Sequence, residues 1–204
     1  MLLVVDYQVG LFQLVRDYTP DQFKTNIIAH AALAKLFNLP VVITSSADTG
    51  SNGPVPVEIT EMHPNAPFIR RQGEVNAWDN PEFRAAVRAA NKTQIIIGGI
   101  VTDVCTAFLA LSLREEGYEV FANTEASGTF NERLATEAND RMKGAGVTLM
   151  GMFAILSDLM RDWRNTPGAA EVLPFIDTYL TAYGFLARAF AAAASTGSSE
   201  QTLA

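Results

Sequence analysis

The amino-acid sequence predicts an α/β fold: a three-layer α/β/α sandwich around a six-stranded, mostly parallel and doubly wound sheet. Short apolar runs alternate along the chain with longer segments of helical pattern, which is typical of repeated βαβ units. The chain has 204 residues, of which 49% are hydrophobic and 18% charged, an ordinary balance for a globular protein. A chain of this length can bury a core without a disulfide or a structural metal. Because parallel neighbours are joined by right-handed crossovers, we expect helices on both faces of the sheet.

The expected strands are continuous runs of apolar or β-branched residues, as in parallel strands that are buried on both faces. Pro40 precedes the second run, and Gly98-Gly99 closes the fourth. In chain order the runs are residues 2–5, 41–44, 67–70, 94–97, 119–122 and 147–150.

The expected helices begin at capping residues and end at glycines. Thr19-Pro20-Asp21 opens the first helix, because Thr or Asp can cap it and Pro suits its first turn. Asn80-Pro81-Glu82 opens the second in the same way, and Gly117 and Gly146 end the third and the fourth. The first helix is expected to end near residue 37, and the last three near residues 116, 145 and 164.

Residues 1–165 are expected to form one domain, because no linker rich in proline or glycine interrupts them. Pro167-Gly168 is a break before a C-terminal appendage, residues 166–194, whose apolar side chains recur close to helical spacing. That appendage could supply contacts between subunits or pack into the core of its own chain. Residues 195–204 are small and polar, so we expect a flexible tail there.

Charge and hydropathy exclude two classes of partner. The net charge of −7 argues against a nucleic-acid partner, because phosphate contacts need a basic surface. The longest weakly polar stretch, residues 185–194, is short and contains Arg188, so we expect no membrane partner. The apolar run at the N-terminus has no basic flank of the kind that signal peptides carry, and the thiol is free. Both features favour a cytoplasmic protein.

The sequence offers no set of residues for a metal or a cofactor. His30 and His63 are the two histidines, and neither has a carboxylate at ligand spacing. Cys105 is the one cysteine, which excludes an internal disulfide and a cysteine-rich metal site. Glycine-rich phosphate-binding motifs are absent as well, so we expect no cofactor.

Candidate catalytic residues stand where strands end, because ligands of doubly wound folds bind beyond the carboxyl ends of the strands. Asp6 could cap the turn that follows its strand, or act as a general base with a pKa raised by partial burial. Arg70 and Arg71 could be solvated, or one of them could stabilise a thiolate. Neither histidine is well placed to act as the base instead.

Cys105 could be an inert residue of the apolar core or a reactive thiol. It follows a glycine-containing turn that leads from a strand into a helix. A thiol near a helix N-terminus has its pKa lowered from about 8.5 toward the reactive range. Unpaired N–H groups in that turn could also stabilise an oxyanion.

Over residues 2–165 the chain resembles the isochorismatase-like cysteine hydrolases, and most closely their YcaC-like branch. Leu3-Val4-Val5-Asp6-Tyr7-Gln8 is similar to the first-strand motif of that family, and Ile97-Gly98-Gly99-Ile100-Val101-Thr102-Asp103-Val104-Cys105 to its nucleophile motif. Residues 71–80, 126–131 and 161–165 are similar to further segments of the YcaC-like branch.

The resemblance implies a catalytic triad of Asp6, Arg71 and Cys105. It also implies a cis peptide bond between Ile100 and Val101, and an oxyanion hole formed by the backbone N–H groups of Val101 and Cys105. Most of the family has Lys at the position of Arg71. The Asp-x-His metal motif of nicotinamidases has no counterpart here, which argues against zinc.

Four further residues would line the substrate pocket if the resemblance holds: Asn76, Trp78, Ile100 and Phe130. The alternative role for Trp78 is that of an aromatic residue at the rim of the site or at an interface with another subunit. Phe130 is a weaker candidate, because apolar aromatic residues usually belong to the core.

These observations predict a cysteine-dependent hydrolase of a small amide-like C–N bond that works through a thioester. The resemblance further implies a homo-oligomer, an octamer of two tetrameric rings. A non-catalytic oligomeric scaffold or small-molecule binder that retains the fold is the alternative, motivated by Arg71 in place of Lys. A third reading is a vinyl-ether hydrolase of the isochorismatase type, which would not need Cys105.

Overall fold

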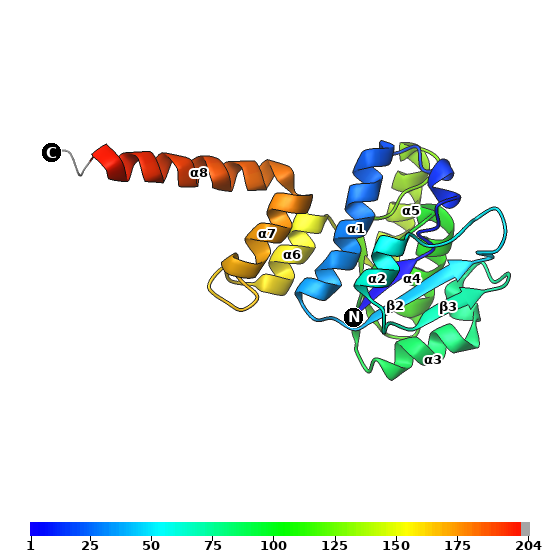
Figure 1. The fold of residues 1–204 in the computed structure, drawn as a ribbon. Helices are drawn as coiled ribbons and strands as arrows, with labels where there is room; N and C mark the ends of the chain where they lie inside the picture. The colour runs from blue at the N-terminus through cyan, green and yellow to red at the C-terminus, as the bar shows by residue number, and fades with distance from the viewer. Residues whose placement is uncertain (201–204) are drawn as a thin grey trace. The chain divides into compact units, whose positions relative to one another are not determined.

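The structure, a computed structural model, describes the backbone of residues 1–200 and the side chains of residues 1–195. Six strands form one sheet in the order β3-β2-β1-β4-β5-β6, and each neighbouring pair is parallel (Figure 1). The strands are β1 (Leu2–Val5), β2 (Val41–Ser46), β3 (Phe68–Arg71), β4 (Gln94–Gly99), β5 (Glu119–Asn123) and β6 (Thr148–Met150). The order reverses between β1 and β4, which confirms the predicted doubly wound sheet.

Helices flank this sheet on both of its faces (Figure 1). Leu3 and Val5 of β1 join a buried cluster with side chains of the helices α3, α4 and α5, so these helices cover one face. The opposite face packs against α1. The helices are α1 (Pro20–Leu36), α2 (Val57–Met62), α3 (Pro81–Ala89), α4 (Ala107–Glu115), α5 (Glu132–Gly144) and α6 (Met152–Met160), with short turns η1 (Leu11–Leu14), η2 (Ala77–Asp79) and η3 (Thr102–Thr106).

The predicted caps and stops are confirmed. Thr19 and Gln22 form a reciprocal capping box at the start of α1, with the N–H of Gln22 donating to Thr19 Oγ1. The Asn80 side chain accepts from the N–H of Phe83 and caps α3. Gly117 and Gly146 follow α4 and α5 with φ of +90° and +85°, the left-handed conformation that ends many helices.

Several boundaries differ from the sequence-based expectation. Gly98 and Gly99 belong to β4 and do not close it. A Cβ on Gly99 would lie 2.7 Å from the Val5 carbonyl oxygen, so the glycine permits close packing of neighbouring strands inside the sheet. The helix α6 ends at Met160 and not near residue 164, because Arg161 has a φ of +64°. The short helix α2 was not predicted.

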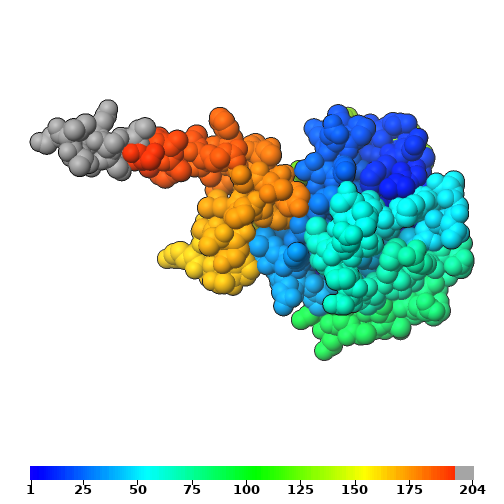
Figure 2. All heavy atoms as spheres, in the orientation of Figure 1, coloured from blue at the N-terminus to red at the C-terminus, as the bar shows by residue number. Residues whose placement is uncertain are grey.

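The described chain divides into two compact units, Met1–Leu156 and Ser157–Ala204. The second unit holds α7 (Ala169–Tyr179) and α8 (Thr181–Glu200), and residues 169–195 of this segment are drawn from orange to red in Figure 2. Within it Trp163 stacks on Tyr183 with ring centroids 5.9 Å apart. The division lies before the predicted one at residues 165 and 166. Of the tail predicted over residues 195–204, the part up to Glu200 is helical, and residues 201–204 lie outside the described residues.

Candidate active site

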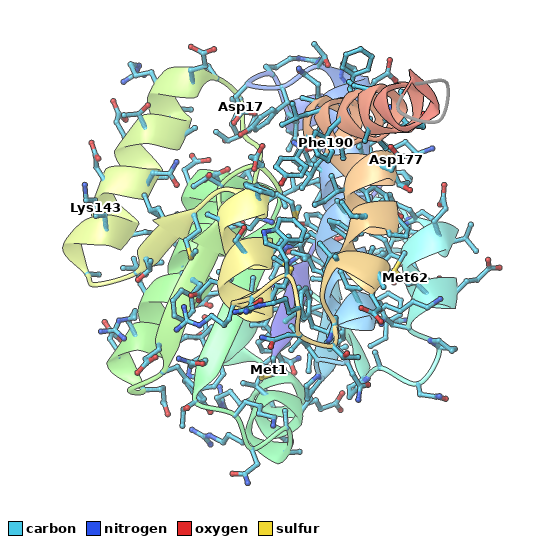
Figure 3. The ribbon with its side chains drawn as sticks, turned by 90° about the vertical axis from the view of Figure 1, so that its left-hand side faces the viewer. Met1, Asp17, Met62, Lys143, Asp177 and Phe190 are labelled. Atoms are coloured by element: carbon cyan, nitrogen blue, oxygen red, sulfur yellow. The ribbon has the colours of Figure 1, made fainter. Side chains whose placement is uncertain are left out.

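Asp6 lies directly after β1, at the carboxyl edge of the sheet. In Figure 3, Met1 marks the other end of β1 and Asp17 lies in the loop that follows Asp6 at this edge. Asp6 is fully buried and its φ is +55°, a left-handed conformation that Asp tolerates better than most residues. Its N–H donates to the Thr44 carbonyl at 3.0 Å, so the backbone of Asp6 continues the pairing of β1 with β2.

Arg71 ends β3, and its side chain is fully buried against Asp6. One guanidinium nitrogen, Nη2, forms an ion pair and hydrogen bond with Asp6 Oδ2. Nε donates to Thr44 Oγ1 at 2.9 Å, and Nη1 donates to the carbonyls of Glu74 and Val75. All three nitrogens are therefore engaged, which compensates for the burial of the charge.

Arg70 points to the other face of β3, because side chains alternate along a strand. Its guanidinium lies 4.3 Å from the Phe68 ring centroid and pairs with Asp48, and 58% of the side chain is exposed. Of the two adjacent arginines that the sequence offered, the structure therefore brings Arg71 alone to Asp6.

Cys105 lies in η3, a π-helical turn that links β4 to α4. The residue is half-buried. Its sulfur lies against the Asp6 carboxylate and the N–H of Val101, and both groups are near enough to shift the pKa of the thiol. The peptide bond between Ile100 and Val101 is cis, as the resemblance implied. Asp6, Arg71 and Cys105 therefore come from the ends of β1, β3 and β4 and meet at one point.

The pKa of the Cys105 thiol is raised to about 12, which contradicts the expectation of a lowered value. Burial is the largest cause, followed by the charge of Asp6 and the hydrogen bond to Asp6, while Arg71 and the Val101 N–H act in the other direction. Cys105 lies just before the N-terminus of α4, where a helix dipole lowers a thiol pKa, but burial and Asp6 outweigh such an effect here. The resting group is a neutral thiol.

The pKa of the Asp6 carboxyl is raised from its ordinary value of 3.8, first by burial, while Arg71 and Cys105 lower it. Oδ2 accepts from Arg71, whereas Oδ1 is buried and lacks a well-aligned hydrogen-bond donor among the described residues. The Cys105 thiol is the neighbouring group that can donate to this carboxylate. The site therefore joins a proton donor, a proton acceptor and a fixed positive charge.

Asn76 and Trp78 have structural contacts in the described chain. The Asn76 side chain accepts from the N–H of Trp78 at 3.0 Å and donates to Ser112 Oγ at 2.9 Å. The Trp78 ring is buried against Phe83 and Tyr118, and it belongs to the core cluster under β1 and β4. These contacts within the chain are sufficient to explain the positions of the Asn76 and Trp78 side chains.

Ile100 is fully buried, and 44% of Phe130 is exposed. Within the described residues, no hydrogen bond, ion pair or ring contact joins any of the four predicted pocket residues to Asp6, Arg71 or Cys105. Their role as pocket residues stays a prediction.

Three groups that hold the arginine were not predicted from the sequence: the Thr44 hydroxyl and the carbonyls of Glu74 and Val75. Thr44 had a usable signal, because it is the polar residue that ends the apolar run Val41-Val42-Ile43. Backbone carbonyls give no such signal. Among the described residues, no group of three or more metal-binding side chains is present, and no helix is long and apolar enough to cross a membrane.

Two hollows on the described surface have volumes of about 620 and 410 Å³. The larger one is lined by residues of α1, α2 and β3, including Phe68 and Arg70, and neither hollow includes Asp6, Arg71 or Cys105. The substrate pocket beside Cys105 stays a prediction.

Comparison with known proteins identifies clear relatives. The family model described as "Isochorismatase domain" matches residues 1–152. The probable hydrolase YcaC of Escherichia coli is 52% identical over 164 residues, which are 80% of this chain and 79% of that protein. The structure of YcaC from Pseudomonas aeruginosa with hexane-2,5-diol and covalent acrylamide superposes with a TM-score of 0.90, at 47% identity and 93% coverage of both chains. The crystal structure of the E. coli YcaC gene product, an octameric hydrolase of unknown specificity, also gives 0.90, at 48% identity, covering 94% of this chain and 93% of that one.

Proposed function

The chain belongs to the isochorismatase family and is a hydrolase, and from this premise we propose that it cleaves a small amide-like C–N bond with Cys105 as nucleophile. The observation that carries the proposal is the contact of the Cys105 thiol with Asp6, a buried carboxylate that is itself paired with Arg71. A nucleophile with an adjacent base, which a third group orients, is the general arrangement for covalent catalysis.

The first half of the reaction forms a thioester. Asp6 takes the thiol proton as Cys105 Sγ attacks the carbonyl carbon, and the carbonyl oxygen becomes an oxyanion. The N–H groups of Val101 and Cys105 would stabilise this oxyanion. When the C–N bond breaks, the leaving nitrogen takes the proton from Asp6 and departs as an amine or ammonia.

The second half of the reaction restores the enzyme. Asp6 takes a proton from water, and the hydroxide oxygen attacks the thioester carbon. The C–S bond then breaks, the product leaves as a carboxylic acid, and the proton on Asp6 returns to the sulfur. Arg71 cannot act as an acid, so it contributes a fixed charge that holds Asp6 in place through both steps.

The raised pKa of the thiol suits this scheme. A neutral thiol beside a carboxylate needs no permanent thiolate, because the proton moves during the attack. The elevated pKa of Asp6 also makes its protonated form a competent acid at the second transfer.

Covalent acrylamide in the P. aeruginosa relative gives independent support. Acrylamide carries an electrophilic double bond next to a primary amide, and a nucleophilic thiol adds to such a bond. We therefore expect acrylamide to label Cys105, with the label located by peptide mass spectrometry.

The test of the function is a panel of small amides, ureido compounds and carbamoyl amines, assayed with the native chain and Cys105→Ser. We expect one or more compounds to release an amine or ammonia with the native chain, and Cys105→Ser to reduce that rate by about 10³-fold or more. If no compound distinguishes the two proteins, the proposal is wrong. A vinyl-ether substrate that Cys105→Ala still hydrolyses at full rate would indicate chemistry of the isochorismatase type.

We also propose that the protein assembles as an octamer, as the E. coli relative does. The apolar side chains of α8 support this, because Phe185, Leu186 and Phe190 are 69%, 62% and 75% exposed in the single chain. The free thiol fits a reducing compartment, and we propose that the assembly is cytoplasmic.

A further inference from the structure

Gln8 is a fully buried polar residue for which the proposed mechanism has no use. It lies two residues after Asp6, where the chain turns sharply away from β1. Its N–H donates to the Asp6 carbonyl at 2.7 Å and closes this turn. The backbone of Gln8 therefore touches the backbone of the proposed base directly.

The Gln8 carboxamide bonds to the end of β2 as a strand backbone would. Oε1 accepts from the N–H of Ser46 at 2.7 Å, and Nε2 donates to the Ser46 carbonyl at 3.0 Å. Nε2 also donates to the Gly53 carbonyl at 2.7 Å. Both N–H donors and the oxygen of the carboxamide are engaged, so the side chain has a defined orientation.

Ser46 is the residue that aligns Arg71. In the pairing of β2 with β3, Ser46 lies opposite Arg71, and the next residue, Ala47, donates its N–H to the Arg71 carbonyl at 2.9 Å. Gln8 therefore connects the turn that carries Asp6 to the strand end that carries the partner of Arg71. Asp6 itself has a left-handed φ of +55°, so the turn needs such outside support.

From these contacts we propose that Gln8 is a positioning residue, whose carboxamide replaces a rung of the β1–β2 ladder and holds Asp6 against Arg71 and Cys105. The inference rests on the proposed function, because it concerns the base of that mechanism. Gln8 touches none of the reacting atoms and acts through Asp6.

The test follows the alkylation of Cys105 by iodoacetamide as a function of pH, which requires no substrate. Asp6 raises the thiol pKa through its charge and its hydrogen bond, and Arg71 is the other charged group that faces the sulfur. In Asp6→Asn both contributions of Asp6 are lost, so alkylation should begin at lower pH. In Gln8→Met the carboxylate is less well held, and the profile should move in the same direction by about one pH unit, a tenfold rate change at fixed pH.

Asn52→Leu is the matched control. The Asn52 side chain donates to the same Ser46 carbonyl at 2.7 Å, but its side chain has no bond to the turn after β1. We expect its alkylation profile to coincide with that of the native chain.

A double-mutant cycle separates positioning from a general structural role. If Gln8 acts through Asp6, Gln8→Met causes no further shift in the Asp6→Asn background. Equal shifts in both backgrounds, or an unchanged profile in Gln8→Met, would overturn the inference. An unchanged profile in Asp6→Asn would instead contradict the proposed contact of acid and thiol. If Gln8→Met does not show a cooperative melting transition, Gln8→Asn replaces it in the same comparison. The Asn side chain is one methylene too short to reach the carbonyls of both Ser46 and Gly53.

Discussion

At the scale of single residues, the site depends on how a buried charge is compensated. Arg71 is fully buried and makes hydrogen bonds through each of its three nitrogens, to a carboxylate, a hydroxyl and two carbonyls. A lysine has three donors on one nitrogen and cannot reach this spread of acceptors. Arg71 therefore has its own set of partners, which include Thr44 and the segment after β3.

We predict that Arg71→Met lowers the free energy of unfolding by about 3–5 kcal/mol, because it leaves the Asp6 charge buried and unpaired. Arg71→Lys should cost less, since it keeps the charge, but still more than about 1 kcal/mol. Urea titrations of the native chain and both variants measure these differences.

Arg70→Lys is the control on the neighbouring residue. The Arg70 side chain is 58% exposed and a lysine keeps its charge beside Asp48, so the change should stay within about 0.5 kcal/mol. Equal losses in Arg70→Lys and Arg71→Lys would contradict the role assigned to the buried arginine.

At the scale of elements, His30 ties α1 to two strands of the sheet. Its Nε2 lies 3.0 Å from the Leu3 carbonyl of β1, and its Nδ1 lies 3.2 Å from Asn123 Nδ2 of β5. This pattern assigns the single ring proton to Nε2, because Nδ1 must accept from the amide. Burial lowers the pKa of His30 to about 4.

We predict that acid weakens the fold through His30. The unfolded chain binds a proton on this ring near pH 6.5, and the folded chain does so only near its pKa of about 4. Stability is therefore complete above pH 6.5 and falls by about 3 kcal/mol as the pH drops to about 4. Urea unfolding at a series of pH values measures the slope.

His30→Gln should flatten the pH dependence of the free energy of unfolding over this range. His63→Gln is the control, because His63 is a half-buried histidine that bonds to the Ala31 carbonyl. In that variant the pH dependence should stay as in the native chain. A slope that survives in His30→Gln would show that other groups cause the loss of stability in acid.

At the scale of the whole molecule, the open question is what covers the apolar side of α8. Phe185, Leu186 and Phe190 lie within two turns of one helix and are largely exposed in the single chain. Exposed aromatic residues so close together are typical of surfaces that meet another protein. Octamer formation would account for them.

We predict that Phe185→Ser combined with Phe190→Ser lowers the mass of the assembly, measured by light scattering during size-exclusion chromatography. The loss of two buried aromatic contacts in every subunit weakens each interface that contains them. Val57→Ser, at an apolar residue of α2 that is 59% exposed, is the control and should leave the mass unchanged. A doubly substituted chain that keeps the native mass would exclude α8 from the interfaces.

The sequence by itself determined the sheet, the helix caps and the three strand ends at which the site is built. These features depend on local chemistry, such as the apolar runs of β1 and β4, the capping box at Thr19 and the stop at Gly117. The residues at the end of β3 left Arg70 and Arg71 open until the family resemblance favoured Arg71, and only the tertiary structure brought Arg71 against Asp6, placed Trp78 in the core and raised the thiol pKa of Cys105. The physical reason is that strand register, burial and the field of a carboxylate depend on segments that are distant along the chain.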